Sequence, residues 1–257
     1  MYATGAVDLA PARALLDQAR SVAVLTGAGM SAESGVPTFR DALTGLWARF
    51  DPAQLATPEA FRADPALVWR WYAERRAGVL RAQPHAGHLA LSAAAPTFER
   101  FALITQNVDG LHARAGSRDV LELHGNILRS HCLDGCGMRY EDLTSLPRGE
   151  PPRCPNCGAW LRPGVVWFGE SLDPHLLGRA EVAVTSCDVL LVVGTSALVY
   201  PAAGLPLQAH HAGAAVVVVN PQPSPLDEGA DLVLRTTAGQ ALPALLAGRS
   251  AQAGPRA

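Results

Sequence analysis

Continuous apolar runs recur along this chain, and most of them are separated by stretches with helical character. Apolar runs without alternation are typical of strands that are buried on both faces of a parallel sheet. We therefore expect strands at residues 22–25, 101–105, 120–123, 165–168, 189–193, 215–219 and 232–234. Strands that alternate with helices predict an α/β fold, a Rossmann-like parallel sheet with helices on both faces.

Proline marks where two further helices begin. Thr57-Pro58 and Asp64-Pro65 each place an N-cap residue directly before a proline at the first helical position. These signals predict helices over residues 58–62 and 65–81. An amphipathic segment over residues 11–20 predicts one more helix before the first strand.

The first predicted strand is followed by a loop with the G-x-G-x-x-G/A spacing, in which the small residues are Gly27, Gly29 and Ala32. Such loops let backbone N–H groups approach a pyrophosphate. The long helix that usually follows is prevented here by Gly35 and Pro37. The chain should turn away instead, carrying Phe39 and Arg40 over a bound nucleotide. An acidic ribose ligand about 20 residues on has no clean candidate, which argues against ordinary hydride transfer.

Two segments interrupt the alternation: residues 39–83, which are helical, and residues 126–161, which bear cysteines and turn residues. We expect them to form a smaller, discontinuous domain made of a helical insertion and a zinc ribbon. The Rossmann-like nucleotide-binding domain would then comprise residues 1–38, 84–125 and 162–257.

Composition narrows the classes of protein. Apolar residues make up 49% and charged residues 17% of the chain, and the net charge is −2. We expect a well-buried protein that binds neither nucleic acid nor a membrane and lies in the cytoplasm. All 21 cationic residues are arginine, which excludes a P-loop lysine and a Schiff-base lysine.

Four cysteines fall into two close pairs at Cys132, Cys136, Cys154 and Cys157. Paired knuckles of this kind present four thiolates to one tetrahedral zinc ion, and a site with four protein ligands is closed and therefore structural. Nearby His131 is a less favoured alternative ligand.

Polar residues follow several of the predicted strands. They are Gln106, Asn107 and Asp109 after residues 101–105, His124 after 120–123, Gly194, Thr195 and Ser196 after 189–193, and Asn220 after 215–219. Ligands of parallel α/β sheets bind beyond the carboxyl ends of the strands. Asn and Asp also cap helices, so Asp109 alone fits either role. The position of His124 suits a general base.

Together these motifs resemble the sirtuin family of NAD-dependent protein-lysine deacylases, over about residues 22–220. The matching elements are Gly27-Ala28-Gly29-Met30-Ser31, Pro37-Thr38-Phe39-Arg40, Thr105-Gln106-Asn107-Val108-Asp109, His124-Gly125, the two cysteine pairs, Val165-Val166-Trp167-Phe168-Gly169-Glu170, Gly194-Thr195-Ser196 and Asn220. The three residues between Cys132 and Cys136, where two are common, leave the conformation of that knuckle open.

The resemblance implies NAD as co-substrate in a cleft between two domains, and one structural Zn2+ ion. Cofactor-binding residues would be Gly27, Ala28, Gly29, Ser31, Phe39, Arg40, Gln106, Asn107, Asp109, Gly194, Thr195, Ser196, Asn220 and Ala238. His124 would act as the base and Asn107 as a second catalytic residue. The products would be free lysine, nicotinamide and 2′-O-acyl-ADP-ribose.

The resemblance also implies how a substrate is bound. An acyl-lysine peptide would lie as a strand beside Val166, Trp167, Phe168, Gly169 and Glu170. Tyr72 and Arg75 lie three residues apart and share a helix face. Periodicity alone favours an arginine that reaches water. The Tyr-x-x-Arg pair, however, is similar to the signature of sirtuins that remove succinyl and malonyl groups. Acetyl removal is expected as well, and the pocket wall would include Ala42, Leu43 and Leu46.

Two other functions stay open from the sequence. One is an NAD-dependent protein ADP-ribosyltransferase, and the other is a non-catalytic module that binds acyl-lysine or NAD. We expect a monomer.

Overall fold

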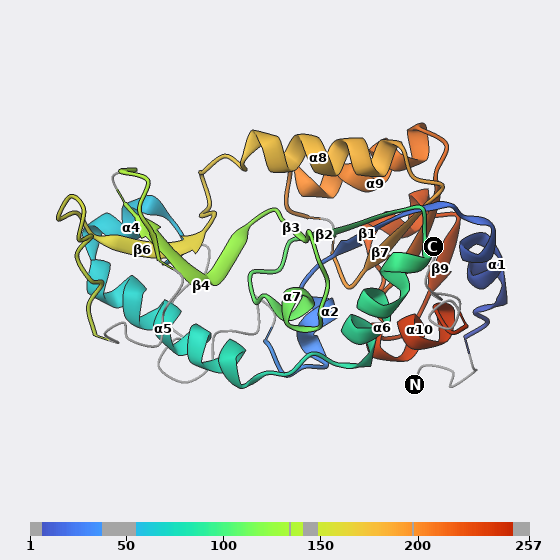
Figure 1. The fold of residues 1–257 in the computed structure, drawn as a ribbon, viewed down its shortest axis with the longest axis horizontal. Helices are drawn as coiled ribbons and strands as arrows, with labels where there is room; N and C mark the ends of the chain where they lie inside the picture. Colours follow the sequence, from blue (N-terminus) through green and yellow to red (C-terminus); the bar gives the residue numbers. More distant parts are fainter. Residues whose placement is uncertain (1–6, 38–54, 134, 141–148, 197, 249–257) are drawn as a thin grey trace, which may run out of the picture.

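The computed structural model describes residues 7–37, 55–133, 135–140, 149–196 and 198–248. Phe39 and Arg40, and the predicted wall residues Ala42, Leu43 and Leu46, lie outside the described residues. The described chain forms two lobes side by side along its longest axis (Figure 1).

The large lobe is built on a six-stranded sheet in the order β3-β2-β1-β7-β8-β9. Every pair of neighbouring strands is parallel. The strands are β1 (Ser21–Thr26), β2 (Arg100–Thr105), β3 (Leu121–Glu122), β7 (Val189–Val193), β8 (Ala215–Val219) and β9 (Leu232–Leu234). The predicted parallel sheet is therefore confirmed, and the apolar runs form its strands because both faces are covered.

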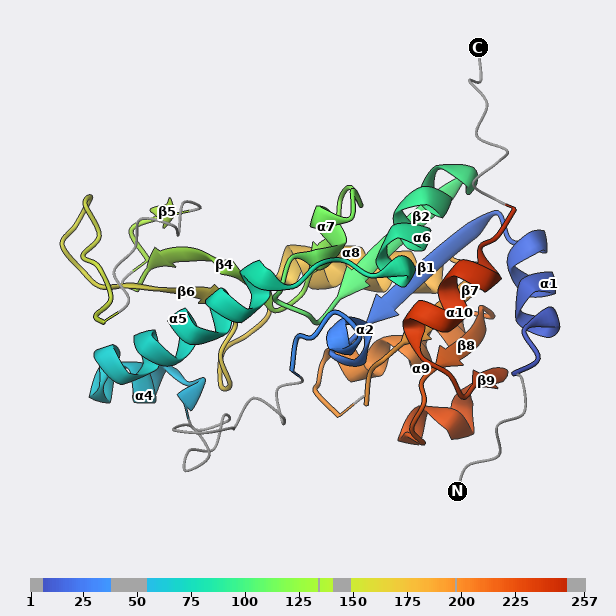
Figure 2. The ribbon, with the colours of Figure 1, turned by 90° about the horizontal axis from the view of Figure 1, so that it is seen from below.

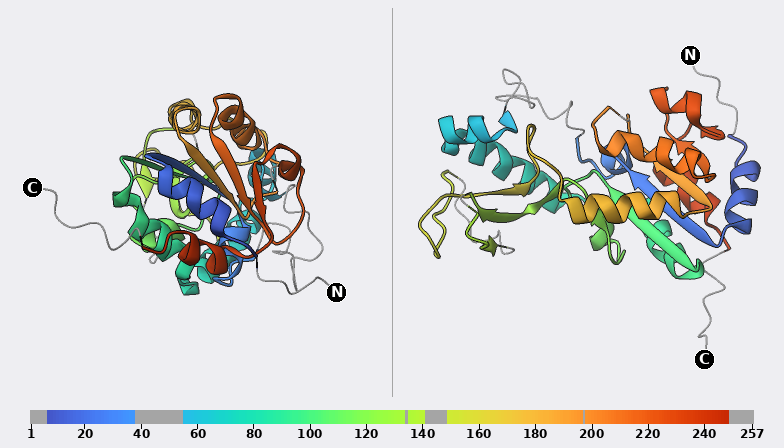
Figure 3. Two further views of the ribbon diagram at one scale, coloured as in Figure 1. Left: turned by 90° about the vertical axis from the view of Figure 1, so that its right-hand side faces the viewer. Right: turned by 90° about the horizontal axis from the view of Figure 1, so that it is seen from above.

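Helices cover both faces of this sheet (Figure 3). On one face lie α1 (Ala10–Gln18), α6 (Ala86–Ala94) and α10 (Ala238–Leu245), which pack on alternate strand residues such as Val24 and Leu191. On the other face lie α8 (Pro174–Thr185) and α9 (Leu205–His211), which pack on Leu25 and Leu190. Alternation of side chains along a strand explains this division.

The small lobe combines two segments that are distant in sequence. They are the helices α4 (Pro58–Ala63) and α5 (Pro65–Arg81), and a three-stranded antiparallel sheet in the order β5-β4-β6. Its strands are β4 (Gly125–Cys132), β5 (Arg139–Tyr140) and β6 (Leu161–Val165). Thr57 and Asp64 cap the two helices through their side chains, as the sequence predicts. In Figure 2, α5 runs along this sheet toward the large lobe.

Short helices complete the described chain. They are α2 (Gly29–Ala32), α7 (Leu111–Arg114), and the 3-10 turns η2 (Ala95–Thr97), η3 (Ala202–Gly204) and η4 (Pro225–Gly229). The four residues of α2 agree with the prediction that no long helix follows the glycine loop. None of the helices in the described ranges is long and apolar enough to cross a membrane.

The strand expected at residues 165–168 is wrong in its position and its sheet. The strand is β6, it ends at Val165, and it pairs antiparallel with β4 in the small lobe. Residues 166–168 follow the strand: the N–H of Val166 still donates to the carbonyl of His124, next to β4, whereas that of Phe168 donates to Ala56. Of these residues, Trp167 is buried in the core of the small lobe, whereas Phe168 is exposed.

The predicted domain boundaries stay a prediction. The boundary at 125/126 lies within β4, and the boundary at 161/162 lies within β6. The core of the small lobe joins α4 and α5 to these strands through Phe61, Trp71, Tyr72, Ile127, Val165 and Trp167.

Candidate functional site

Two glycine-containing loops cross at the carboxyl ends of β1 and β7. The N–H of Gly29 donates to the carbonyl of Gly194 at 2.8 Å. A Cβ atom on Gly29 would lie 2.8 Å from Gly194 Cα, and one on Gly27 would lie 2.7 Å from Thr195 Cβ. Side chains at these positions would push the loops apart, so glycine is required here for the close approach of two backbones.

The loop after β2 is hydrogen-bonded to the glycine loop through buried side chains. Asn107 Nδ2 donates to the carbonyl of Gly27 at 2.9 Å and to Ser31 Oγ at 3.1 Å. Ser31 Oγ donates in turn to Asp109 Oδ2 at 2.7 Å. Burial raises the pKa of Asp109, while hydrogen bonds from Leu111 and Ser31 oppose the shift. These bonds hold both loops in one arrangement.

The same set of contacts extends to the ends of β7 and β8. Gln106 Nε2 donates to Thr195 Oγ1 at 3.0 Å, and Asn220 Nδ2 donates to the carbonyl of Thr195 at 3.1 Å. Ser196 follows with an exposed side chain, whereas Ala238 is buried in the large-lobe core together with Met30. The structure thus joins residues from the ends of β1, β2, β7 and β8 at one edge of the sheet.

His124 lies between β3 and β4, and its Nδ1 is 2.9 Å from the carbonyl oxygen of Gln106. A carbonyl only accepts hydrogen bonds, so Nδ1 carries the proton and Nε2 keeps a lone pair. Burial lowers the pKa of His124, and the bond to Gln106 opposes that shift. The side chain is therefore neutral near pH 7 and is able to accept a proton.

Tyr72 and Arg75 lie on α5 beside the core of the small lobe. Tyr72 is buried, and its hydroxyl oxygen accepts a hydrogen bond from Trp167 Nε1 at 3.0 Å. Burial raises the pKa of Tyr72 to about 12, and the positive charge of Arg75 opposes this shift. Arg75 is half-buried, with its guanidinium carbon 4.9 Å from the ring centroid of Trp71.

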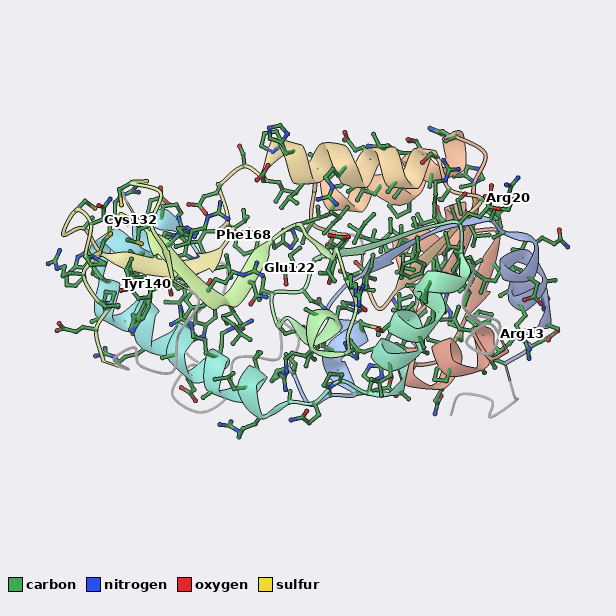
Figure 4. All side chains as sticks on the ribbon, viewed as in Figure 1. Arg13, Arg20, Glu122, Cys132, Tyr140 and Phe168 are labelled. Carbon is green, nitrogen blue, oxygen red and sulfur yellow. The ribbon has the colours of Figure 1, made fainter. Side chains whose placement is uncertain are left out.

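The segment of residues 166–170 lies between the two lobes, where Figure 4 shows Phe168 and Glu122. Phe168 is 44% exposed, whereas Trp167 is buried. Gly169 has a φ of 85°, which favours glycine. Glu170 forms an ion pair with Arg162 and also accepts a hydrogen bond from the backbone N–H of Trp167 at 2.8 Å.

The four predicted metal ligands form one group. The Sγ atoms of Cys132, Cys136, Cys154 and Cys157 all lie within 4.8 Å of one another. Cys132 and Cys157 are 3.4 Å apart, and Cys136 and Cys154 are 3.5 Å apart. Tetrahedral coordination with Zn–S bonds of about 2.3 Å requires S–S distances of about 3.8 Å, so the donor set fits zinc. His131 is not a member of the group.

Arg162 is the residue of this region that sequence reasoning missed. Its side chain is only 7% exposed, and it bonds to Glu170 and to the carbonyl of Val165. A signal existed, because this arginine stands within the otherwise uncharged run of residues 158–169. A charge in such a run indicates a buried pair with an acidic partner.

Comparison with known proteins agrees with this geometry. The model of the Sir2 family matches residues 27–201. A relative from Ralstonia nicotianae, named NAD-dependent protein deacylase, is 61% identical over 93% of this chain and 96% of its own length. NAD-dependent protein deacylase 1 from Pseudomonas aeruginosa is 53% identical over 90% of this chain and 95% of its own.

Solved structures give the same result. A crystal structure of a Sir2 homologue in complex with NAD matches with a TM-score of 0.89 and 43% identity, over 97% of this chain and 96% of that chain. A mutant Sir2 homologue in complex with 2′-O-acetyl ADP ribose matches with a TM-score of 0.87 and 43% identity, over 96% and 99%. The chain belongs to the Sir2 family.

Proposed function

We propose that this chain is an NAD-dependent protein-lysine deacylase. The observation that carries the proposal is His124, a neutral imidazole whose Nδ1 is bonded to the Gln106 carbonyl at 2.9 Å, with Nε2 left as a base. Gln106 directly precedes Asn107, which is bonded to the glycine loop. The names of the Ralstonia and Pseudomonas relatives support this activity.

In this proposal NAD binds at the carboxyl ends of the central strands. Gly27, Ala28 and Gly29 approach the phosphates, Gln106, Asn107 and Asp109 line the nicotinamide pocket, and Asn220 meets the adenosine ribose. The remaining contacts come from Ser31, Gly194, Thr195, Ser196 and Ala238, and from Phe39 and Arg40, which lie outside the described residues. The NAD complex of the structural relative supports this location.

The chemistry assigned to this chain is proton removal and positioning. The acyl oxygen of the modified lysine bonds to the ribose carbon from which nicotinamide departs. Nε2 of His124 accepts the proton of a ribose hydroxyl, which then attacks the acyl carbon. Asn107 holds the loop after β2 against the glycine loop through its bonds to Gly27 and Ser31, and so helps to position NAD for the reaction. The bond between the acyl carbon and the lysine nitrogen then breaks, and one water molecule adds to the acyl carbon. The products are free lysine, nicotinamide and 2′-O-acyl-ADP-ribose.

The peptide binds beside residues 166–170, between the lobes. The N–H groups of Val166, Trp167, Phe168 and Glu170 already donate within the protein. A peptide strand would therefore bond to other backbone groups of this segment. The partners of the enzyme are acyl-lysine proteins, and we propose that it acts as a monomer in the cytoplasm.

Removal of His124 tests the deacylase proposal. We expect His124→Ala to lower turnover of acyl peptides by about 10²–10⁴-fold, because a general base contributes about that much. NAD binding by calorimetry and the urea unfolding midpoint should change little. His175→Ala is the matched control, because His175 is exposed on α8.

Mass analysis of the products separates this activity from its alternatives. Free acyl-ADP-ribose supports deacylation. ADP-ribose attached to a protein indicates the transferase, and binding without nicotinamide release indicates a module without catalysis. Either of the last two results would overturn the proposal.

We further propose that the enzyme prefers succinyl and malonyl groups and also removes acetyl groups. Tyr72 and Arg75 would bind the terminal carboxylate, because guanidinium and phenol both donate to it. Both residues lie on α5, three positions apart and on one face of the helix, which supports this role.

Arg75→Met tests the acyl preference. We expect kcat/KM for a succinyl peptide to fall about 10- to 100-fold, since a hydrogen bond to a charged group contributes about 1.5–3 kcal/mol. The value for the matching acetyl peptide should change little. Arg70→Met, at an exposed position of the same helix, is the control. Equal losses on both peptides would refute the role of Arg75.

A further inference from the structure

The hydrogen bond between Trp167 and Tyr72 has only one possible direction. An indole N–H donates and never accepts, so the Tyr72 oxygen is the acceptor at 3.0 Å. The hydroxyl hydrogen of Tyr72 must then point away from Trp167. Tyr72 is also held by ring contacts, with Trp71 at 4.7 Å and Trp167 at 6.5 Å between centroids. Its phenol therefore has one defined donor direction.

Trp167 is itself held on several sides. The guanidinium carbon of Arg162 lies 3.4 Å from its ring centroid, and Phe61 lies 5.3 Å away. Glu170 accepts the backbone N–H of Trp167 at 2.8 Å and is paired with Arg162. Arg162 also donates to the carbonyl of Val165 at 2.9 Å. A buried aromatic ring with this many directed contacts has a defined orientation.

The same short segment also reaches the base of the proposed reaction. Val166, next to Trp167, donates its N–H to the carbonyl of His124 at 2.9 Å. Residues 166 and 167 thus connect His124, the proposed base, with Tyr72, which would contact the acyl chain. This connection distinguishes Trp167 from the other large core residues of the small lobe, such as Phe61 and Trp71.

We propose that Trp167 is a positioning residue for acyl selectivity. Its Nε1–H occupies the acceptor site of the Tyr72 hydroxyl and so directs the Tyr72 O–H toward the terminal carboxylate of a succinyl or malonyl group. Arg162 and Glu170 hold the indole in this orientation. The inference rests on the proposed preference for succinyl and malonyl groups. Trp167 would orient the Tyr72 hydroxyl without touching the carboxylate itself.

The test is a double-mutant cycle with succinyl and acetyl versions of one peptide. Trp167→Phe removes the N–H, and Tyr72→Phe removes the hydroxyl. We expect each to lower the ratio of succinyl to acetyl kcat/KM about 5-fold, as one hydrogen bond contributes about 1 kcal/mol. The loss should be in KM, because the carboxylate is bound equally before and during reaction. The double variant should lose no more than Tyr72→Phe alone.

Packing effects are separated by two further variants. Val79→Ala changes the packing of the same core at a residue that is not among the contacts of Trp167, and it removes no side-chain hydrogen bond, so it should leave the ratio unchanged. If Trp167→Phe does not fold, benzothienylalanine at position 167 replaces the N–H by sulfur at nearly constant shape. This variant should give the same 5-fold change.

The outcomes distinguish the inference from the function on which it rests. Equal losses on both peptides, or additive losses in the double variant, would overturn the role of Trp167. If Arg75→Met changes the ratio and position 167 does not, the acyl preference stands and the inference falls. If neither changes the ratio, both fall.

Discussion

The two lobes of this protein are stabilised in different ways. In the large lobe, the strands pair in parallel and bury apolar residues on both faces of the sheet, as Leu25 and Leu191 illustrate. In the small lobe, β4 and β6 pair with a register shift between Gly125 and Ser130. Polar groups released by this irregularity require partners from elsewhere.

Those partners are specific. Within the shift, the N–H of Ile127 donates to the carbonyl of Val108 at 2.8 Å. The carbonyl of Ile127 accepts from Arg76 Nε at 2.8 Å, and Arg76 Nη2 donates to Ser130 Oγ at 3.2 Å. Burial lowers the pKa of Arg76 to about 10. The stability of the large lobe therefore comes mainly from apolar packing. The stability of the small lobe depends on a few specific hydrogen bonds and on the cysteine group.

Removing the metal should give the largest loss of activity, and it shows whether the small lobe can unfold while the large lobe stays folded. We expect Cys154→Ser to abolish zinc binding and deacylase activity, because structural zinc contributes about 10–16 kcal/mol in small zinc-binding peptides. Hydrogen exchange should show protection lost in β4–β6 and retained in β1, β7 and β8.

Cys187→Ser is the control for this experiment, because Cys187 lies outside the cysteine group. It should keep one zinc ion per chain by atomic absorption. Full activity of the zinc-free Cys154→Ser variant would contradict the structural role.

Arg76→Met should give an intermediate effect that is confined to the small lobe. We expect a loss of about 2 kcal/mol in the free energy of unfolding, since two hydrogen bonds from a charged donor disappear while the cost of burying the charge is relieved. Urea denaturation measures the loss. Arg70→Met, exposed on the same helix, should change stability by less than about 0.5 kcal/mol. Equal losses in both variants would mean that Arg76 acts only through helix propensity.

Mild acid should give the smallest loss of stability, and two buried histidines of the large lobe, His88 and His112, should cause it. Burial lowers the pKa of His88 to about 3 and that of His112 to about 4. Unfolded histidine titrates near 6.5, so below that pH the unfolded chain binds protons that the folded chain does not. The contribution of these two histidines to the free energy of unfolding is therefore greatest well above pH 6.5 and is lost as the pH falls toward 4.

From pH 7 to pH 6 we expect each of these histidines to remove about 0.7 kcal/mol from the free energy of unfolding. Burial also lowers the pKa of His124, which acts in the same direction. Urea unfolding at the two pH values measures the change, and His88→Gln should reduce it. A stability that rises on acidification would show that carboxylates dominate instead.

Prediction from the sequence succeeded where local pattern and tertiary environment agree. The runs at residues 189–193, 215–219 and 232–234 are strands with the predicted bounds, because apolar β-branched residues suit a sheet covered on both faces. Helix α5 begins and ends as expected, since Asp64 and Pro65 define its start chemically. The four cysteines form one group because their spacing already contains two knuckles.

Prediction from the sequence failed where an apolar run belongs to the small lobe and not to the central sheet. Residues 166–168 look like a strand, but Trp167 fills the small lobe and their N–H groups bond to His124, Glu170 and Ala56. The real strand β6 contains Pro163 and Gly164, which hide it from any hydrophobic pattern. The role of Arg162 was missed altogether, because its partner Glu170 is identified only by the ion pair in the folded structure.

The sequence by itself determined the fold class, the glycine loop, the cysteine group and the family, because each depends on residue types at short spacing. Only the tertiary structure decided which nitrogen of His124 carries the proton and in which direction the Tyr72 hydroxyl donates. Both depend on partners, Gln106 and Trp167, that are distant along the chain and meet only when the sheet and the two lobes have formed. Hydrogen-bond direction is a property of pairs in space, and a linear pattern does not contain it.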